Sequence, residues 1–288
     1  MSPGASSSVS ETANVWLTLS NKAENVLLVR QALSGLAEMI HLDPVELNDV
    51  STAVSEACNN VVLHAYEGGP GQLEVEIHAG QALEVVVRDR GVGIHPRQVD
   101  HEEIAGGIGL PVIRALTHEV EFKDVPGGGT EVKMRFETAH SQSLQLGQES
   151  SSAQTHPVDG SAPEGEDRLT IAVGPPTLAR AVLPRVLSAL AARAYFSTDR
   201  ISDTQLIADA ILAQAEDSFE TSRLNVEVDV KPRDLQLRIG PLREGSAEVV
   251  LAAATINGLG SVFEHLTDAR EISSQGGTET LALRLAER

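Results

Sequence analysis

Two hydrophobic periods alternate along the chain up to Glu137, one typical of strands and one typical of amphipathic helices. Apolar positions three or four apart predict a helix from Val26 to about His41, and a second from Pro44 to about Tyr66 that Asp43 can cap. Strict alternation predicts strands at residues 15–19, 73–77, 83–87, 120–122 and 132–136, and a short helix is expected at residues 110–116. The order β-α-α-β-β-α-β-β predicts an α+β fold, a two-layer sandwich with the helices on one face of the strands.

A similar pattern returns later in the chain. Leu17-Thr18-Leu19 is matched by Leu169-Thr170-Ile171, and Gly128-Gly129-Thr130-Glu131 by Gly276-Gly277-Thr278-Glu279. Five such matches occur in the same order at offsets between 148 and 154, which indicates a tandem duplication. Between the copies the chain is rich in Ser, Gln, Gly, Pro and acidic residues, a composition typical of a flexible linker. We therefore expect a domain at residues 10–137, a linker at 138–167 and a second copy at 168–288.

Composition and charge narrow the class of protein. The balance of 22 Lys+Arg against 41 Asp+Glu gives a net charge of −19, which argues against direct binding to nucleic acid or to a membrane surface. Hydrophobic residues make up 41% of the chain, enough for packed cores. Cys58 is the single cysteine, no apolar stretch reaches the length of a membrane span, and the first residues lack a secretory signal. We expect a cytoplasmic protein with protein partners.

Candidate chemistry begins on the predicted second helix. Glu56 and Asn60 are four residues apart and project from one face, with Asn59 and His64 nearby. A carboxylate beside an amide can orient a hydroxyl group and can hold a hard cation through oxygen. A polar helix face without a ligand would look the same, and His64 and the small buried Cys58 are expected to be structural.

Three glycine-rich turns follow. Asp89-Arg90-Gly91-Val92-Gly93 comes directly after a strand, where glycines admit a flat ligand and the carboxylate can accept from an exocyclic amine. Ala105-Gly106-Gly107-Ile108-Gly109 precedes a helix, whose first N–H groups suit phosphates. Gly127-Gly128-Gly129-Thr130 opens the last strand and could place a hydroxyl near a ligand. Each turn taken alone is equally well explained as a turn without a ligand.

In this order and spacing the four clusters resemble the N, G1, G2 and G3 boxes of the GHKL ATPase superfamily. Ser55–Tyr66 and Gly109–Leu116 further resemble the anti-sigma-factor serine/threonine kinases of bacterial sporulation and stress control. The resemblance covers about Val15 to Glu137. It implies the two-layer Bergerat fold, ATP and Mg²⁺ as cofactors, and two partners, a sigma factor and an anti-anti-sigma protein of the STAS type.

The resemblance also implies a role for each matching residue. Glu56 would be the general base that takes the proton of a partner's hydroxyl, Asn60 the Mg²⁺ ligand and Asp89 the acceptor of the adenine amine. Residues from about 94 to 107 would form a lid over ATP. Further ATP contacts are implied at Asn59, Gly91, Gly93, Ile94, Gly107, Ile108, Gly109 and Thr130.

The chain departs from the family pattern at one place. Many relatives carry an arginine within or just before the Gly-x-Gly segment, where it can reach the γ-phosphate, but Ala105, Gly106 and Ile108 stand here. Either Arg114 or a His or Arg of the lid substitutes, or phosphoryl transfer is slow. A non-catalytic, nucleotide-dependent binding module is therefore one alternative. A histidine-kinase fragment is a second, disfavoured because no phosphoacceptor helix pair precedes the first strand.

The second copy has lost the chemistry. On the repeat alignment Glu56 becomes Ala210 and Asn60 becomes Gln214, and residues 240–245 do not fit Asp-x-Gly-x-Gly, although Gly258-Leu259-Gly260 and Gly277-Thr278 remain. Relatives of one domain usually act as homodimers. We therefore expect an intramolecular pseudo-dimer, monomeric in solution, in which the second copy is a scaffold and partner clamp. Two independent domains on a string are the alternative.

Overall fold

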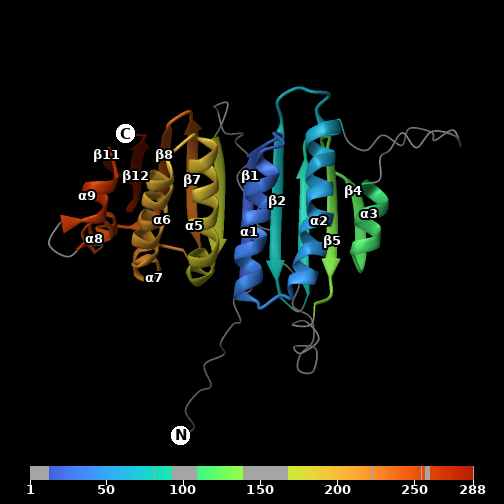
Figure 1. Cartoon of the computed structure of the whole chain (residues 1–288), viewed down its shortest axis with the longest axis horizontal. Coiled ribbons are helices and arrows are strands. Elements are labelled where there is room, and N and C mark those ends of the chain that lie inside the picture. The colour runs from blue at the N-terminus through green and yellow to red at the C-terminus, as the bar shows by residue number, and fades with distance from the viewer. Residues whose placement is uncertain are drawn as a thin grey trace, which may run out of the picture.

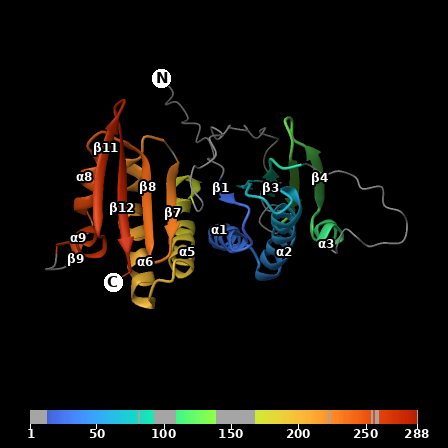
Figure 2. The ribbon, with the colours of Figure 1, turned by 90° about the horizontal axis from the view of Figure 1, so that it is seen from above.

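A single antiparallel sheet organises the computed structural model, which describes residues 13–80, 82–92, 109–138, 168–221, 223–253, 255–256 and 260–287. The sheet has ten strands in the order β11-β12-β8-β7-β6-β1-β2-β3-β5-β4 (Figure 1). Helices α1, α2, α5 and α6 lie on one side of it, as the view from above shows (Figure 2). The predicted α+β arrangement, with strands gathered together and helices on one face, is confirmed.

The N-terminal half (residues 13–138) contains the predicted elements in the predicted order. They are β1 (Ala13–Ser20), α1 (Asn25–Met39), α2 (Pro44–Asn60), η1 (Val61–Ala65), β2 (Gln72–Ala79), β3 (Leu83–Asp89), α3 (Gly109–Leu116), β4 (Glu119–Asp124) and β5 (Thr130–Phe136). Asp43 caps α2 as expected, since its carboxylate accepts from the Val45 N–H at 2.8 Å. The second helix differs from the prediction at its end, where η1 is π-helical.

The C-terminal half (residues 168–287) repeats this order, with α7 where the N-terminal half has η1, and with α8, β9 and β10 in a stretch whose counterpart in the N-terminal half lies outside the described residues. Its elements are β6 (Arg168–Gly174), α5 (Pro176–Arg193), α6 (Thr198–Leu212), α7 (Ala215–Ser218), β7 (Leu224–Lys231), β8 (Asp234–Arg243), α8 (Ser246–Ala253), β9 (Thr255–Ile256), β10 (Gly260–Ser261), α9 (Val262–Leu266), β11 (Ala269–Gln275) and β12 (Thr278–Ala286). The two halves place corresponding strands in the same order outward from β1 and β6.

The corner between the first two helices is built alike in both halves. His41 and Tyr195 both take a left-handed conformation, with φ of 51° and 60°. The next N–H in each half bonds back to the preceding helix, from Leu42 to the Ala37 carbonyl at 2.9 Å and from Phe196 to Ala191 at 3.0 Å. The two corners lie 154 positions apart in the chain, within the range of offsets of the sequence matches.

A second corner, after the last helix of each half, also repeats. The hydroxyl of Thr117 donates to the Ile113 carbonyl at 2.8 Å, and that of Thr267 donates to the Phe263 carbonyl at 2.5 Å. Hydrogen bonds that recur at matching positions support the proposal that the halves arose by duplication.

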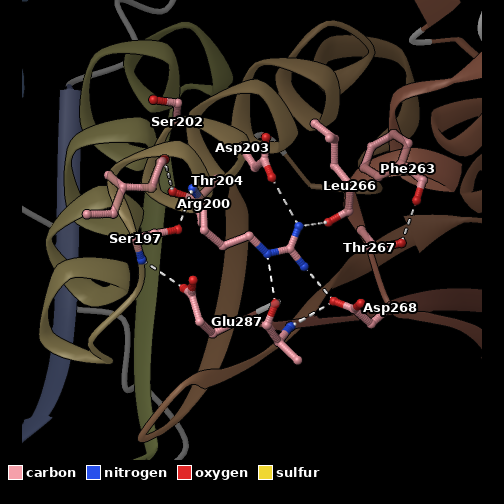
Figure 3. Close-up of polar contacts among 12 residues, drawn as sticks. Ser197, Arg200, Ser202, Asp203, Thr204, Phe263, Leu266, Thr267, Asp268 and Glu287 are labelled. Atoms are coloured by element: carbon pink, nitrogen blue, oxygen red, sulfur yellow. Dashed lines mark hydrogen bonds and ion pairs between the residues drawn. The ribbon is translucent and has the colours of Figure 1, made fainter.

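Arg200 ties together the outer part of the C-terminal half (Figure 3). Its side chain is 3% exposed, and its guanidinium donates to the Ala286 carbonyl at 2.8 Å, the Leu266 carbonyl at 2.7 Å and the carboxylates of Asp203 and Asp268. A buried cation needs such partners, because an unpaired charge away from water is costly. The network joins the start of α6 to the ends of α9 and β12.

The two halves meet along β1 and β6, which we call the seam. These strands pair antiparallel from Asn14 with Gly174 to Thr18 with Thr170. Helices α1 and α5 cross above them at Gly35, where an added Cβ would overlap the Ala181 carbonyl. One cluster of buried aliphatic residues extends through both halves. The seam therefore joins the halves through backbone hydrogen bonds and through a shared core.

The single tryptophan of the chain marks this seam. Trp16 lies on β1, and the guanidinium of Arg223, which belongs to the C-terminal half, lies 3.6 Å from its ring centroid. A cation over an indole face is favourable, most of all where water is partly excluded. Trp16 can therefore report on the contact between the halves.

Among the described residues, no helix has the length and apolar composition needed to cross a membrane. Cys58 is buried in α2, and burial raises the pKa of its thiol to about 12. Its thiolate is therefore almost absent at neutral pH, in line with the expectation that Cys58 is structural.

Candidate functional site

The N-terminus of α3 lies against the polar face of α2. Glu56 and Asn60 are half-buried on that face, while its neighbours Ala57 and Cys58 face the core. At Gly109, the first residue of α3, an added Cβ would be 2.9 Å from Glu56 Oε2 and 3.6 Å from Asn60 Oδ1. The missing side chain therefore leaves space for the two oxygen-bearing groups next to the first N–H groups of a helix, a place suited to anions.

Asp89 is buried where β3 ends. It is 4% exposed, and its Oδ1 accepts from the Gly91 N–H at 2.9 Å. Thr130, 7% exposed, donates to the same carboxylate from its backbone and its hydroxyl. Burial raises the pKa of Asp89 above its ordinary value, and the hydrogen bonds from Gly91 and Thr130 oppose part of that rise. A carboxylate accepts about four hydrogen bonds, so it has capacity for one more donor.

Two glycines let the backbone close around Asp89. An added Cβ at Gly91 would overlap the carbonyl of Ala65, the last residue of η1. At Gly129, which has φ of 101°, a Cβ would overlap the Asp89 carbonyl. These contacts require glycine for sterics and, at Gly129, for conformation. The structure thus brings the second and fourth sequence clusters together at the end of η1.

The two groups of residues lie at different places along one continuous helical segment, Pro44 to Ala65, and the Asp89 group is at its C-terminal end. Glu56 is on α2 and Ala65 ends η1, nine residues later. At about 1.5 Å per residue this corresponds to roughly 14 Å along the axis. A ligand that contacts both the Asp89 group and the Glu56 group must be elongated, with a polar donor at one end and negative charge at the other.

The remaining predicted site residues divide into two sets. Asn59 is described but points elsewhere, because it lines a groove of about 670 Å³ between α1 and α2 together with Leu27 and Arg30. Gly93, Ile94, Gly107 and Ile108, with the lid predicted at residues 94–107, lie outside the described residues, as does the predicted linker from residue 139.

Arg114, one candidate substitute for the missing arginine, faces another way. Its guanidinium lies 6.0 Å from the ring centroid of Phe122, on β4. His64 is exposed near the end of η1 and is not among the residues that gather around Asp89 or Gly109. The other candidate substitutes belong to the lid, outside the described residues.

Tyr66 is a site residue that the sequence reading did not single out. Its hydroxyl accepts from the Arg90 N–H at 2.9 Å and donates to the Gln72 carbonyl at 2.6 Å, so it fixes the turn after Asp89. Burial raises the pKa of this phenol. No sequence signal marks the role, because the hydroxyl joins backbone groups that are 24 and 6 residues away.

The side chains present fit a magnesium nucleotide. Among the described residues no cluster of three or more His, Cys, Asp or Glu side chains could hold a metal alone. Mg²⁺ does not need one, since it commonly binds one or two protein oxygens and completes its shell with phosphates and water. Asn60 Oδ1, beside the space at Gly109, is suited to that position.

The corresponding part of the C-terminal half is arranged differently. The end of β8, which corresponds to the end of β3, reads Ile239-Gly240-Pro241-Leu242-Arg243 and carries no carboxylate in the place of Asp89. Phe219, 1% exposed, forms a bridge with Leu242. The side chains of proline and phenylalanine have no oxygen, so they can neither accept a hydrogen bond as Asp89 does nor bind a cation.

The N-terminus of α8 in this half already has an anionic partner. The Glu279 carboxylate accepts from the Ala247 N–H at 2.9 Å and from the Gly245 N–H. These bonds hold the pKa of Glu279 below its ordinary value. The protein's own carboxylate thus occupies the helix terminus, a position that elsewhere suits a phosphate.

Comparisons with known proteins agree with this division of the chain. Residues 19–136 match the family model described as "Histidine kinase-like ATPase domain". This match ends before the C-terminal half and covers the described groups around Glu56 and Asp89. The two-layer fold of the N-terminal half is therefore of the GHKL ATPase type.

Several curated proteins are similar to the same region. An anti-sigma F factor of Thermoanaerobacter sp. (strain X514) is 29% identical over 127 residues, which are 41% of this chain and 89% of that protein. A serine-protein kinase RsbW of Halalkalibacterium halodurans is 33% identical over 135 residues, 41% of this chain and 81% of that protein. An anti-sigma F factor of Pasteuria penetrans is 36% identical over 126 residues, 39% of this chain and 82% of that protein.

Proposed function

Because the chain belongs, through its N-terminal half, to the family of anti-sigma F factors and RsbW serine-protein kinases, we propose that this half binds Mg-ATP and phosphorylates a serine or threonine of an anti-anti-sigma protein. We propose that the chain also sequesters a sigma factor. One observation carries the catalytic part: Glu56 and Asn60 both lie against Gly109, on the helical segment whose C-terminal end lies beside the buried Asp89.

In this proposal Asp89 selects adenine as the nucleobase of the bound nucleotide. Its carboxylate, held by Gly91 and Thr130, has acceptor capacity left for the exocyclic amine of adenine. Gly91 and Gly129 bring backbone close to that position without side chains in the way. A guanine base would present a carbonyl oxygen instead of the amine, and two acceptors would then face each other.

Glu56 and Asn60 act at the phosphate end. Bound Mg-ATP supplies the phosphoryl group and a cation that offsets the charge developing on it. Glu56 takes the proton of the partner's hydroxyl while the oxygen–phosphorus bond forms and the bond from the γ-phosphorus to the ADP oxygen breaks. Asn60 Oδ1 holds the cation, and the first N–H groups of α3 after Gly109 face the phosphates.

A nucleotide-dependent binding module without transfer is the second candidate. Arg114 packs on Phe122, and the other substitutes for the missing arginine are in the lid. Loss of a phosphate-contacting arginine slows transfer strongly in other phosphoryl-transfer enzymes, by factors of about 10³ to 10⁵. In this version ATP sets the affinity for the partner and is not consumed.

We propose further that the chain is an intramolecular pseudo-dimer. In this proposal residues 10–137 form the nucleotide-binding domain, residues 138–167 a linker and residues 168–288 a degenerate copy of that domain. The β1–β6 ladder, the crossing of α1 and α5 at Gly35 and the shared core support this arrangement. One chain would then present two similar faces to its partners, and tethering would keep a weak interface closed.

Single-turnover transfer from labelled ATP to a candidate anti-anti-sigma protein tests the catalytic proposal. Glu56→Gln keeps the shape of the side chain and removes its basicity, so transfer should fall by about 10² to 10⁴ while nucleotide affinity is kept. Glu46→Gln, on the same helix but in its first turn, should have no effect on transfer. Transfer by Glu56→Gln at the wild-type rate would assign the base elsewhere. Nucleotide binding without transfer by the wild-type chain would favour the second candidate.

A further inference from the structure

One side chain of the C-terminal half reaches across the seam to the start of α1 in the N-terminal half. Arg193 is the last residue of α5, and its side chain is 16% exposed. Its Nη1 donates to Asn25 Oδ1, and its Nε lies 3.8 Å from Glu24 Oε1. Asn25 begins α1 and is 1% exposed. The contact crosses the seam from a half that has no candidate catalytic residue.

Asn25 holds the end of β1. Its amide nitrogen donates to the Ser20 carbonyl at 2.7 Å and to the Ser20 hydroxyl at 2.9 Å. With the nitrogen turned to Ser20, the oxygen must face Arg193, so both partners fix the orientation of the amide. A buried amide oxygen needs a donor, and Arg193 is that donor.

Asn21, which directly follows Ser20 at the end of β1, connects this strand to the loop after η1. Its side chain donates to the Gly69 carbonyl at 3.0 Å and accepts from the Gly71 N–H at 2.8 Å. Its own N–H donates to the Gly71 carbonyl at 3.0 Å. An added Cβ at Gly71 would overlap the ring of Tyr66, so the loop and that ring are in close contact. The end of β1 is thus connected to Tyr66 through Asn21 and the close contact at Gly71.

Tyr66 completes the connection to the nucleotide site. Its hydroxyl accepts from the Arg90 N–H, between Asp89 and Gly91. The path from Arg193 to Asp89 therefore runs through Asn25, the end of β1, the loop at Gly71 and Tyr66. Every hydrogen bond along it is made by a described residue.

We propose that Arg193 is a positioning residue, supplied by the C-terminal half, for the nucleotide site of the N-terminal half. The inference rests on the proposed nucleotide binding of that half. It gives the C-terminal half a role in the reaction that requires none of the residues it has lost. It also makes nucleotide affinity depend on an intact seam.

Amide hydrogen exchange and ADP titration of the full chain test this role with Arg193→Met, which keeps length and removes the donors. Exchange at the Gly71 and Arg90 amides should become faster without nucleotide, while exchange within β3 stays unchanged. ADP affinity should fall by about 2- to 30-fold, the range of coupling effects at residues that do not touch the ligand. Arg193→Lys retains a donor and should recover most of both effects.

Arg185→Met is the matched control. Arg185 is on the same helix and pairs with Glu38 across the same seam, but on its exposed side. Equal effects of the two methionine variants, or no effect of Arg193→Met on the two amides, would overturn the proposal. Should Arg193→Met fail to fold, Arg193→Gln takes its place, because its shorter side chain loses the contact with Asn25: faster exchange at the Arg90 amide supports the proposal and an unchanged rate contradicts it. A wild-type chain that binds no ADP refutes nucleotide binding, whereas the Arg90 amide still decides the role of Arg193.

Discussion

In the N-terminal half β3 ends at Asp89 and the chain turns away through Gly91, whereas in the C-terminal half β8 continues to Arg243 and leads into α8. Elsewhere the halves agree closely, down to the left-handed residues His41 and Tyr195. The C-terminal half thus keeps the hydrogen-bonded corners and the strand order, but it does not keep the side chains of Asp89, Glu56 and Asn60. The fold depends on buried aliphatic positions and turns, while the site depends on a few polar residues that can be lost separately.

The difference also shows how the C-terminal half can remain stable without a ligand at this place. Glu279 supplies the anion at the start of α8, and the buried Phe219 forms a β-bridge with Leu242. Buried space without a ligand costs packing energy, so a side chain that fills it is favourable. In our proposal the C-terminal half is a scaffold with its own internal contacts, and Arg193 contacts the N-terminal half at Asn25.

Breaking the seam should have the largest effect. In Gly35→Leu the new side chain would overlap the Ala181 carbonyl, and overpacking of this kind costs about 1–3 kcal/mol. We expect a lower free energy of unfolding, measured by denaturant titration of Trp16 fluorescence. The emission should also change in the folded chain if Arg223 leaves the indole.

Ser34→Ala is the control for that variant, because Ser34 is the neighbouring residue of α1 and lines the α1–α2 groove instead of the seam. It should leave stability and emission near the wild-type values. Equal stability of Gly35→Leu and Ser34→Ala would show that α1 and α5 do not pack as described.

Removing the charge of Asp89 should separate binding from stability. Asp89→Asn is expected to weaken ADP binding by about 10- to 100-fold, the equivalent of one hydrogen bond to a charged group. Because the folded-state pKa of Asp89 is raised, ionisation opposes folding as pH rises from the unfolded-state pKa through the folded-state one. The stability of the variant relative to the wild type should therefore improve across that window. If Asp89→Asn instead became less stable relative to the wild type as pH rises, burial would not be the cause of the raised pKa of Asp89.

The smallest effect is expected at Glu279, in the C-terminal half. Its pKa is lowered, so its stabilising contribution is present above the unfolded-state pKa and is lost as pH falls through the folded-state value. Thermal unfolding of Glu279→Gln should occur at a lower temperature than that of the wild type at neutral pH, and the difference should disappear in acid. The exposed Glu244→Gln serves as the control. A difference that persists unchanged at low pH would mean that the charge of Glu279 does not hold α8.

The spacing of hydrophobic residues along the chain predicted most of the fold, because each helix and strand of the N-terminal half buries one face in a shared core. The strand at residues 83–87 is present within β3, and Asp43 caps α2 as its position predicted. The π-helical turn η1 had no sequence signal, since the apolar spacing of a helix hardly changes over five residues. The ladder between β1 and β6 could not be read either, because strand pairing across separate segments leaves no local pattern.

The site was predicted to the extent that its residues lie in local motifs. Glu56, Asn60 and Gly109 meet as the motif order suggested, and so do Asp89 and Thr130. Asn59 lines a groove instead, because neighbouring residues of a helix such as Asn59 and Asn60 point about 100° apart. Arg193 and Tyr66 act through contacts between distant segments, which a sequence pattern does not contain.

Calorimetric titration of the full chain with Mg-ADP tests most directly the central claim that one half binds nucleotide and the other does not. We predict one nucleotide per chain, and binding that Asp89→Asn weakens while Glu279→Gln leaves it unchanged. Two nucleotides per chain, or binding at full affinity by Asp89→Asn, would contradict the assignment of the site to the N-terminal half.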